Sequence, residues 1–72
     1  MSKVFASITR HNSPVTHHIP VTEYDQLYDH MMWLTGNDHE ISDEAASWCE
    51  MAAIGEEYNF REGYIILTEM ES

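Results

Sequence analysis

The sequence predicts a small α+β domain in which a three-stranded antiparallel sheet carries two helices on one face. Two segments near the start of the chain alternate apolar and polar residues with a period of two, as strands do. Two segments in the middle place apolar residues at helical spacing, and the last segment is apolar at successive positions. The chain has 72 residues, of which 43% are hydrophobic, so it is expected to fold as one domain over residues 1–72.

A β-hairpin is expected at the start of the chain. Residues 3–10 alternate in polarity and contain β-branched side chains, which favours a strand. The segment Asn12-Ser13-Pro14 is typical of a turn, and residues 15–21 are again rich in β-branched side chains. Pro20 cannot donate a hydrogen bond to a neighbouring strand, so we expect this second strand at a sheet edge or near its own end.

The first helix is expected over residues 23–35. Thr22 is the expected N-cap, and Asp25 three residues later approximates a capping box. Gly36 provides a C-terminal stop. The predicted inner face consists of Tyr24, Leu27, Tyr28, Met31, Met32 and Leu34.

The second helix is expected to begin after a polar link at residues 37–40. Ser42 is its expected N-cap, and Gly55 is its expected end. Two acids follow Ser42 and would lie at the positive end of the helix dipole. The predicted inner stripe consists of Ala45, Trp48, Cys49 and Ala52.

The end of the chain predicts the central strand of the sheet. Residues 56–63 are interpreted as a connection, with a short extended piece at 58–60 as the open alternative. Residues 64–70 follow as a strand whose centre is apolar on both faces, which favours a central position. The predicted element order is therefore ββααβ.

Charge excludes several classes of function. Thirteen Asp and Glu oppose three Lys and Arg, which gives a net charge of −10. Residues 1–22 contain Lys3 and Arg10 and no acid (+2), whereas residues 23–72 contain all thirteen acids and only Arg61 (−12). Direct binding to nucleic acid requires basic groups that displace counterions from phosphates, so it is not expected here. Binding to an anionic membrane is excluded on the same ground.

The sequence also indicates a cytoplasmic protein. Its single cysteine, Cys49, excludes an internal disulfide. No apolar run approaches the roughly 20 residues that a membrane-spanning helix needs. The N-terminal segment has no long apolar stretch of the kind found in a signal peptide.

No catalytic motif is visible, and we predict neither an enzyme nor a cofactor. Cys49 with a histidine base is one alternative, but its place on the inner stripe favours a buried structural thiol. His17 and His18, with His11, His30 or His39, are a possible set of metal ligands, yet neighbouring residues of a strand point to opposite faces. A hydrolase with paired carboxylates would need a desolvated acid, which the predicted helix surfaces do not provide. No metal site is predicted.

The outer faces of the predicted helices suggest a partner-binding surface. Asp25, Asp29 and Trp33 follow one another at intervals of four residues on the first helix. Asp43 and Glu50 lie on the outer side of the second. Stable soluble surfaces tend to mix both signs, whereas these helices carry acids with almost no base. We expect the four acids to pair with lysine and arginine on a partner and Trp33 to fill a cleft.

The segments TEYDQLYDHMMW and SDEAASWCEM, within residues 22–54, resemble those of small acidic proteins of phages and mobile elements. That class includes anti-CRISPR and anti-restriction inhibitors, some of which act as nucleic-acid mimics. The resemblance implies a non-enzymatic inhibitor that occupies the basic surface of a nucleic-acid-binding host defence complex. The alternative is a homodimeric structural or regulatory module, joined through exposed aromatics and a sheet edge, in which acidity serves solubility alone.

Overall fold

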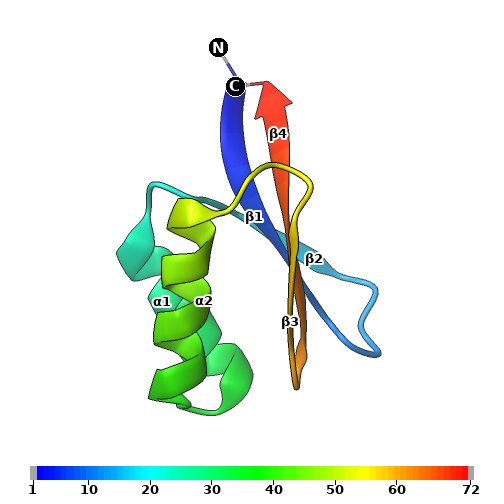
Figure 1. The fold of residues 1–72 in the computed structure, drawn as a ribbon. Helices are drawn as coiled ribbons and strands as arrows, with labels where there is room; N and C mark the ends of the chain where they lie inside the picture. Colours follow the sequence, from blue (N-terminus) through cyan, green and yellow to red (C-terminus); the bar gives the residue numbers. More distant parts are fainter. Residues whose placement is uncertain (1, 72) are drawn as a thin grey trace.

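The computed structural model describes residues 2–71 and contains two helices and one four-stranded antiparallel sheet. In chain order the elements are β1 (Ser2–Arg10), β2 (Thr16–Pro20), α1 (Tyr24–Thr35), α2 (His39–Met51), β3 (Glu57–Phe60) and β4 (Gly63–Glu71). The strands are ordered β2-β1-β4-β3, and both helices lie on one face of the sheet (Figure 1). The α+β class is confirmed.

The expected number of strands was wrong, because residues 57–60 form a strand rather than part of a connection. β3 pairs with the first half of β4, placing Tyr58 opposite Ile65 and Phe60 opposite Gly63. Tyr58 and Phe60 pack against the core, whereas Glu57 and Asn59 are exposed. Four residues are too few for this alternation to stand out in the sequence. The element order is therefore ββααββ.

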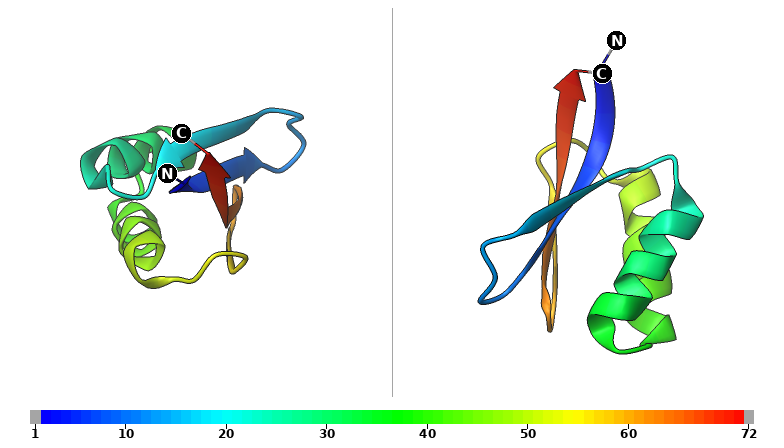
Figure 2. Two further views of the ribbon diagram at one scale, coloured as in Figure 1. Left: turned by 90° about the horizontal axis from the view of Figure 1, so that it is seen from above. Right: turned by 180° about the vertical axis from the view of Figure 1, so that it is seen from behind.

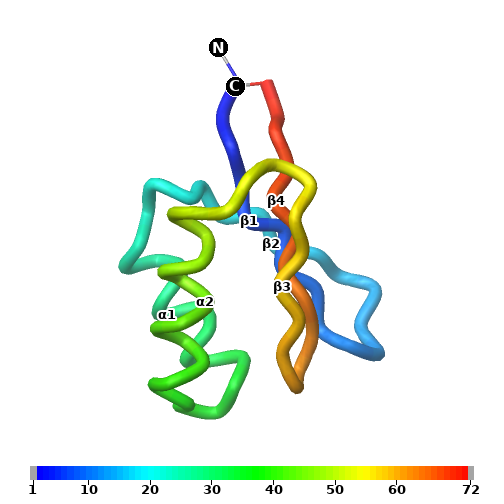
Figure 3. Tube along the Cα trace, viewed as in Figure 1, coloured from blue at the N-terminus to red at the C-terminus, as the bar shows by residue number. Residues whose placement is uncertain are grey.

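The sheet positions of the other strands match the prediction. β4 is central, between β1 and β3, and β2 with its Pro20 is an edge strand. β1 and β4 form the longest ladder, which runs from the pair Ser2–Glu71 to the pair Arg10–Gly63. Figure 3 shows these two strands side by side up to their outer ends.

The core lies between the sheet and the two helices. β1 and β4 each contribute two fully or almost fully buried residues, and the helices cover them from one side only (Figure 2). Cys49 is 2% exposed, which confirms the predicted buried thiol. The buried hydrophobic residues are Ala6, Ile8, Ile19, Leu27, Met31, Leu34, Ala45, Ala46, Cys49, Ile65 and Leu67.

The expected caps at the start of both helices were wrong. α1 follows Glu23, which makes no side-chain cap, so Thr22 lies outside the helix. α2 begins earlier than expected because the Asp38 side chain accepts a hydrogen bond from the Ile41 N–H, at 3.0 Å. Ser42 therefore lies inside the helix, where its hydroxyl donates to the Asp38 carbonyl oxygen at 2.7 Å.

At the C-terminal ends of the helices, the expected stop is confirmed for α1 and wrong for α2. Gly36 terminates α1 in the left-handed conformation, with φ 70°, as expected. α2 ends at Met51, before the expected Gly55. Gly55 instead sits in the following loop with φ 93°, and its N–H donates to the Leu67 carbonyl oxygen at 2.9 Å. That bond directs the chain toward the sheet edge where β3 begins.

Candidate partner-binding surface

The exposed side of the two helices carries acids and no lysine or arginine. We call its six exposed acids the acidic layer. No lysine or arginine occurs between Arg10 and Arg61, so neither helix contains a positive side chain other than histidine. The members of the acidic layer are Asp25 and Asp29 of α1 and Glu40, Asp43, Glu44 and Glu50 of α2.

Two tyrosines hold carboxylates of α2 in place from opposite sides. The Tyr24 hydroxyl of α1 donates to Asp43 Oδ1 at 2.7 Å. The Tyr58 hydroxyl of β3 donates to Glu44 Oε1 at 2.8 Å. Hydrogen bonds to an ionised acceptor are shorter and stronger than those between neutral groups. Two adjacent acids of α2 are thus oriented by the elements on either side of it.

The phenol groups remain donors throughout the neutral range. The hydrogen bond to Asp43 raises the pKa of Tyr24 above its ordinary value, with a smaller contribution from burial. Burial, together with the hydrogen bond to Glu44, raises the pKa of Tyr58 to about 12. Both tyrosines therefore keep their protons near pH 7, and both carboxylates keep their hydrogen bonds.

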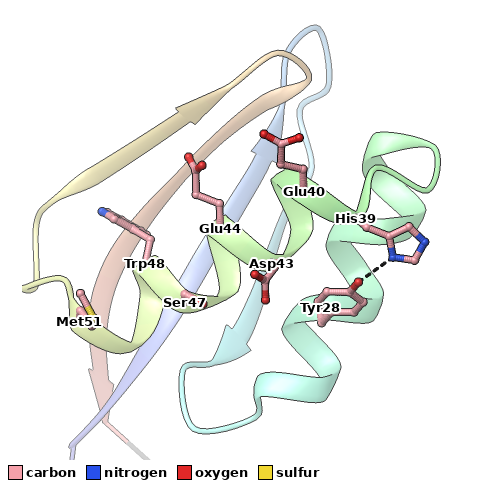
Figure 4. Close-up of a pocket in the computed structure, with 8 residues that line it drawn as sticks. All are labelled: Tyr28, His39, Glu40, Asp43, Glu44, Ser47, Trp48 and Met51. Carbon is pink, nitrogen blue, oxygen red and sulfur yellow. Dashed lines mark hydrogen bonds between the residues drawn. The ribbon is translucent and has the colours of Figure 1, made fainter.

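A broad pocket of about 790 Å³ lies along the outer side of α2 (Figure 4). Glu40 and Glu44 project on one side of the helix, and Asp43 projects on the side nearer α1. Met51 is 86% exposed and forms the apolar end with the half-buried Trp48. A lysine or arginine has both an aliphatic stem and a charged end, so this combination of surfaces suits it.

A hydrogen bond between the two helices lies at the other end of this pocket (Figure 4). Tyr28 Oη and His39 Nδ1 are 2.8 Å apart, and both side chains line the pocket. Tyr28 also stacks on Tyr24, with ring centroids 6.3 Å apart and planes 20° from parallel. The two stacked tyrosines of α1 thus reach α2 through their hydroxyls, Tyr24 at Asp43 and Tyr28 at His39.

The structure brings some of the predicted site residues together and separates others. Asp43 accepts the hydrogen bond from Tyr24, and the negative charges of Asp43 and Glu50 both help to raise the pKa of Tyr24. Asp25 and Asp29 are exposed one turn apart on α1. All four acids are exposed, as predicted from the sequence, and all four belong to the acidic layer.

Trp33 is 65% exposed, which confirms its predicted place outside the core, but its neighbours are basic or aromatic. The Arg10 guanidinium carbon lies 5.9 Å from the centroid of the Trp33 ring. The His30 ring lies 5.8 Å from Trp33 and 4.8 Å from His17. We call these four residues the hairpin cluster. Trp33 thus lies against side chains from β1 and α1, and it does not line the pocket on α2.

His30 is the most constrained member of the hairpin cluster. Its Nε2 atom is buried and has no hydrogen-bond partner among residues 2–71. Burial, with a smaller contribution from His17, lowers the pKa of His30 below its ordinary value of 6.5. The neutral imidazole therefore suits this position, where it packs between a strand and a helix.

Sequence reasoning missed part of the candidate surface. Glu40 was assigned to the link because the helix was expected to start at Ser42, and Glu44 was not selected as a contact residue. Glu40 and Glu44 are four residues apart, so they lie next to each other on one face of a helix that begins at His39. The correct start of α2 would therefore have revealed this acidic pair. The hydrogen bond from Tyr58 depends on β3, of which the sequence offered only a short extended piece at 58–60, as an alternative to a connection.

Neither a metal site nor a membrane span is found in the part of the chain that the structure describes. Among residues 2–71, no group of three or more His, Cys, Asp or Glu could hold a metal ion. Over that same span, neither helix is long and apolar enough to cross a membrane. The contact between His17 and His30 brings only two such side chains together.

The chain matches no family model, no curated protein and no solved structure. Similarity therefore assigns neither a family nor a function to it. What the protein does has to be inferred from the acidic layer, the pocket on α2 and the remaining surfaces.

Proposed function

We propose that the protein is a non-enzymatic inhibitor that binds a basic macromolecule through its acidic layer. The target is a groove that otherwise holds nucleic-acid phosphates, and occupation of that groove displaces the nucleic acid. One observation carries this proposal: six exposed acids lie on two adjacent helices that contain no lysine or arginine, and tyrosines orient two of them.

Solubility alone does not account for this arrangement. Like charges four residues apart destabilise a helix by roughly 0.2–0.5 kcal/mol per pair, and the acidic layer contains two such pairs, Asp25–Asp29 and Glu40–Glu44. Mixing lysines into the same faces would relieve that repulsion and keep the protein soluble. The hydrogen bonds from Tyr24 and Tyr58 also immobilise carboxylates, which solubility does not require.

The geometry of the acidic layer suits a groove that binds a phosphate backbone. Residues four apart on a helix are separated by about 6 Å along its axis. Pre-oriented carboxylates lose less side-chain freedom on binding than mobile ones do. The unscreened negative field would also accelerate encounter with a positive surface at low salt. An acidic layer of this kind can therefore compete with nucleic acid for the same lysines and arginines.

The test begins with a comparison of two charge-reversal variants. Asp43→Lys/Glu50→Lys changes the acidic layer, whereas Glu56→Lys/Glu69→Lys makes the same change in net charge at exposed positions elsewhere. Each protein is immobilised and exposed to bacterial lysate at about 50 mM salt, where charge interactions are weakly screened. Proteins retained by the wild type and the control variant, but not by the acidic-layer variant, are identified by mass spectrometry.

Each retained protein is then purified and tested for competition. We expect the wild type to displace nucleic acid from it, and we expect the apparent affinity to fall steeply as salt rises. Retained proteins that do not bind nucleic acid, or binding that is indifferent to both salt and charge reversal, would contradict the proposal.

The specific form of this proposal concerns host defence. On the resemblance to phage inhibitors, CRISPR effector complexes and restriction enzymes are the first targets to test. Addition of the protein to such an enzyme should reduce DNA binding, and the Asp43→Lys/Glu50→Lys variant should not. Inhibition of cleavage with DNA binding unchanged would contradict mimicry.

A further inference from the structure

The face of the sheet that points away from the helices differs in composition from the rest of the surface. Ala6 and Ile8 of β1 are in the core, so the odd-numbered residues of that strand point the other way. The strand register places the even-numbered residues 64–70 of β4 beside them. We call these residues, with the residues paired to them on β2 and β3, the open sheet face.

The open sheet face is almost free of acids. It carries one lysine, Lys3, and one acid, Glu57, whose charges cancel. Its one histidine is His18. The other twelve of the thirteen acids (13 − 1) lie elsewhere in the chain. Two copies of a protein with a net charge of −10 repel each other, and this face is where two copies can approach with least repulsion.

The centre of the open sheet face is apolar. Phe5, Tyr64, Ile66 and Met70 come from the two central strands and are half-buried by their neighbours. In contrast to the helical side, no element among residues 2–71 covers them (Figure 2). Adjacent apolar side chains on an uncovered sheet gain free energy when another surface excludes water from them.

The serine and threonine hydroxyls of the open sheet face are hydrogen-bonded to neighbours on the same face. Ser7 Oγ lies 2.8 Å from His18 Nδ1 and 2.9 Å from Thr68 Oγ1. Thr9 Oγ1 and Thr16 Oγ1 are 2.9 Å apart. A covered hydroxyl is costly only if it loses its hydrogen bond. These hydroxyls already have partners within the monomer, so water can leave the face without stranding them.

We propose that the open sheet face is a homodimer interface, in which two copies pack sheet against sheet. Sheets packed in this way keep their strands within about 30° of alignment. In an isologous dimer with its two-fold axis parallel to the strands, β2 of one copy lies over β3 of the other. His18, Ser7, Ile66 and Glu57 share one row across the four strands. The two-fold axis therefore brings His18 of each copy toward Glu57 of the second copy.

The size of the face indicates a weak dimer. Four strands about 4.8 Å apart, over seven residues at about 3.3 Å each, give a footprint of roughly 400 Å². Side chains make each face uneven, so two such faces bury about 1,000 Å² in total, which is near the lower limit for a specific interface. We therefore expect a weak dimer that dissociates on dilution.

Sedimentation velocity tests this proposal with two variants that add one lysine each. The wild type should shift from monomer toward dimer between about 5 and 500 μM, the concentration range in which weak association becomes visible. Ile66→Lys, at the centre of the face, should weaken association at least tenfold. Met51→Lys makes the same change in charge on the exposed side of α2 and should associate like the wild type. A wild type that stays monomeric over this range would overturn the proposal.

Dilution of isotope-labelled wild type, followed by NMR, gives a result that does not depend on whether a variant folds. Amide signals of β1 and β4 should move with concentration, and those of α1 and α2 should not. Concentration-dependent shifts confined to the helices would overturn the proposal.

The dimer and the proposed inhibitory function fail separately. Salt screens the repulsion between two acidic copies, so added salt should strengthen the dimer and weaken binding to a basic partner. Ile66→Lys should keep partner binding, and Asp43→Lys/Glu50→Lys should keep the dimer.

Discussion

The two sides of this small protein have opposite compositions. The two helices carry six exposed acids and contain no lysine or arginine, and tyrosines orient two of the acids. The open sheet face carries Lys3 and Glu57 at its margins and apolar residues at its centre. Negative charge is therefore sorted by face. The difference indicates two binding modes, one electrostatic through the helices and one apolar through the sheet.

The largest expected effect concerns the core between the two faces, which should take no part in chemistry. Burial raises the pKa of the Cys49 thiol from 9.0 to about 11. Because the thiolate is the reactive form, this shift alone should slow alkylation by iodoacetamide about 100-fold relative to the unfolded chain. Alkylation measured by mass spectrometry with and without denaturant tests this. Equal rates in both conditions would show that the thiol is accessible and the core assignment wrong.

The next largest effect is expected from charge reversal on the helical side. A nona-arginine peptide serves as a defined basic probe. Asp43→Lys/Glu50→Lys should bind it about 30-fold more weakly than the wild type at low salt, since exposed ion pairs contribute up to about 1 kcal/mol each. Fluorescence anisotropy measures the affinity, and Glu56→Lys/Glu69→Lys is the matched control. Equal losses in both variants would mean that only net charge matters and that the faces do not differ in function.

A smaller effect should follow from removal of the tyrosine hydroxyls without any change in charge. Tyr24→Phe/Tyr58→Phe frees Asp43 and Glu44, so these side chains must be ordered when a partner binds. We expect about threefold weaker binding of nona-arginine, because ordering a mobile side chain has an entropic cost. Tyr64→Phe on the open sheet face is the control. Unchanged affinity in the double variant would argue against pre-orientation.

The smallest effect concerns the hairpin cluster, which belongs to neither face. Burial, and then His17, hold the pKa of His30 below 6.5, so below that pH the unfolded chain takes up a proton that the folded protein resists. The contribution of His30 to the free energy of unfolding should therefore be fully retained above about pH 6.5 and decline as pH falls toward its lowered pKa. Urea denaturation at a series of pH values measures this contribution. The nearby Trp33 and Arg10 do not change charge over this pH range.

The variant His30→Gln separates this contribution from protonation of the many acids. Its stability should fall less than that of the wild type between pH 7 and pH 5, because residue 30 no longer titrates. Parallel pH profiles for the two proteins would contradict the assigned role of His30.

Much of the fold could be predicted because its periodic signals are long. Residues 3–10 alternate over a full strand, and residues 24–35 repeat their apolar positions over three turns, so these elements and the α+β class followed from the sequence. β3 has only four residues, and its pairing with β4 is a tertiary fact. At α2, Asp38 and Ser42 both have the chemistry of an N-cap, and the sequence alone favoured the wrong one.

The candidate site was predictable to a similar extent. The exposure of Asp43 and Trp33 followed from helical geometry, which requires only local sequence. The contact between Trp33 and Arg10 joins α1 to β1, and the bond between Tyr58 and Glu44 joins β3 to α2. Such contacts depend on how the elements pack, and no local pattern records them. The positions of the exposed acids could therefore be predicted from the sequence, but the contacts that orient their side chains could not.

The central claim is that the acidic layer, rather than net charge, binds basic partners. The most direct measurement is an NMR titration of the labelled protein with nona-arginine at low salt. The claim predicts that amide shifts concentrate in α1 and α2 and disappear at high salt, while the open sheet face is unaffected. Shifts that are equally large near Glu56, Glu69 and the helical acids would contradict it.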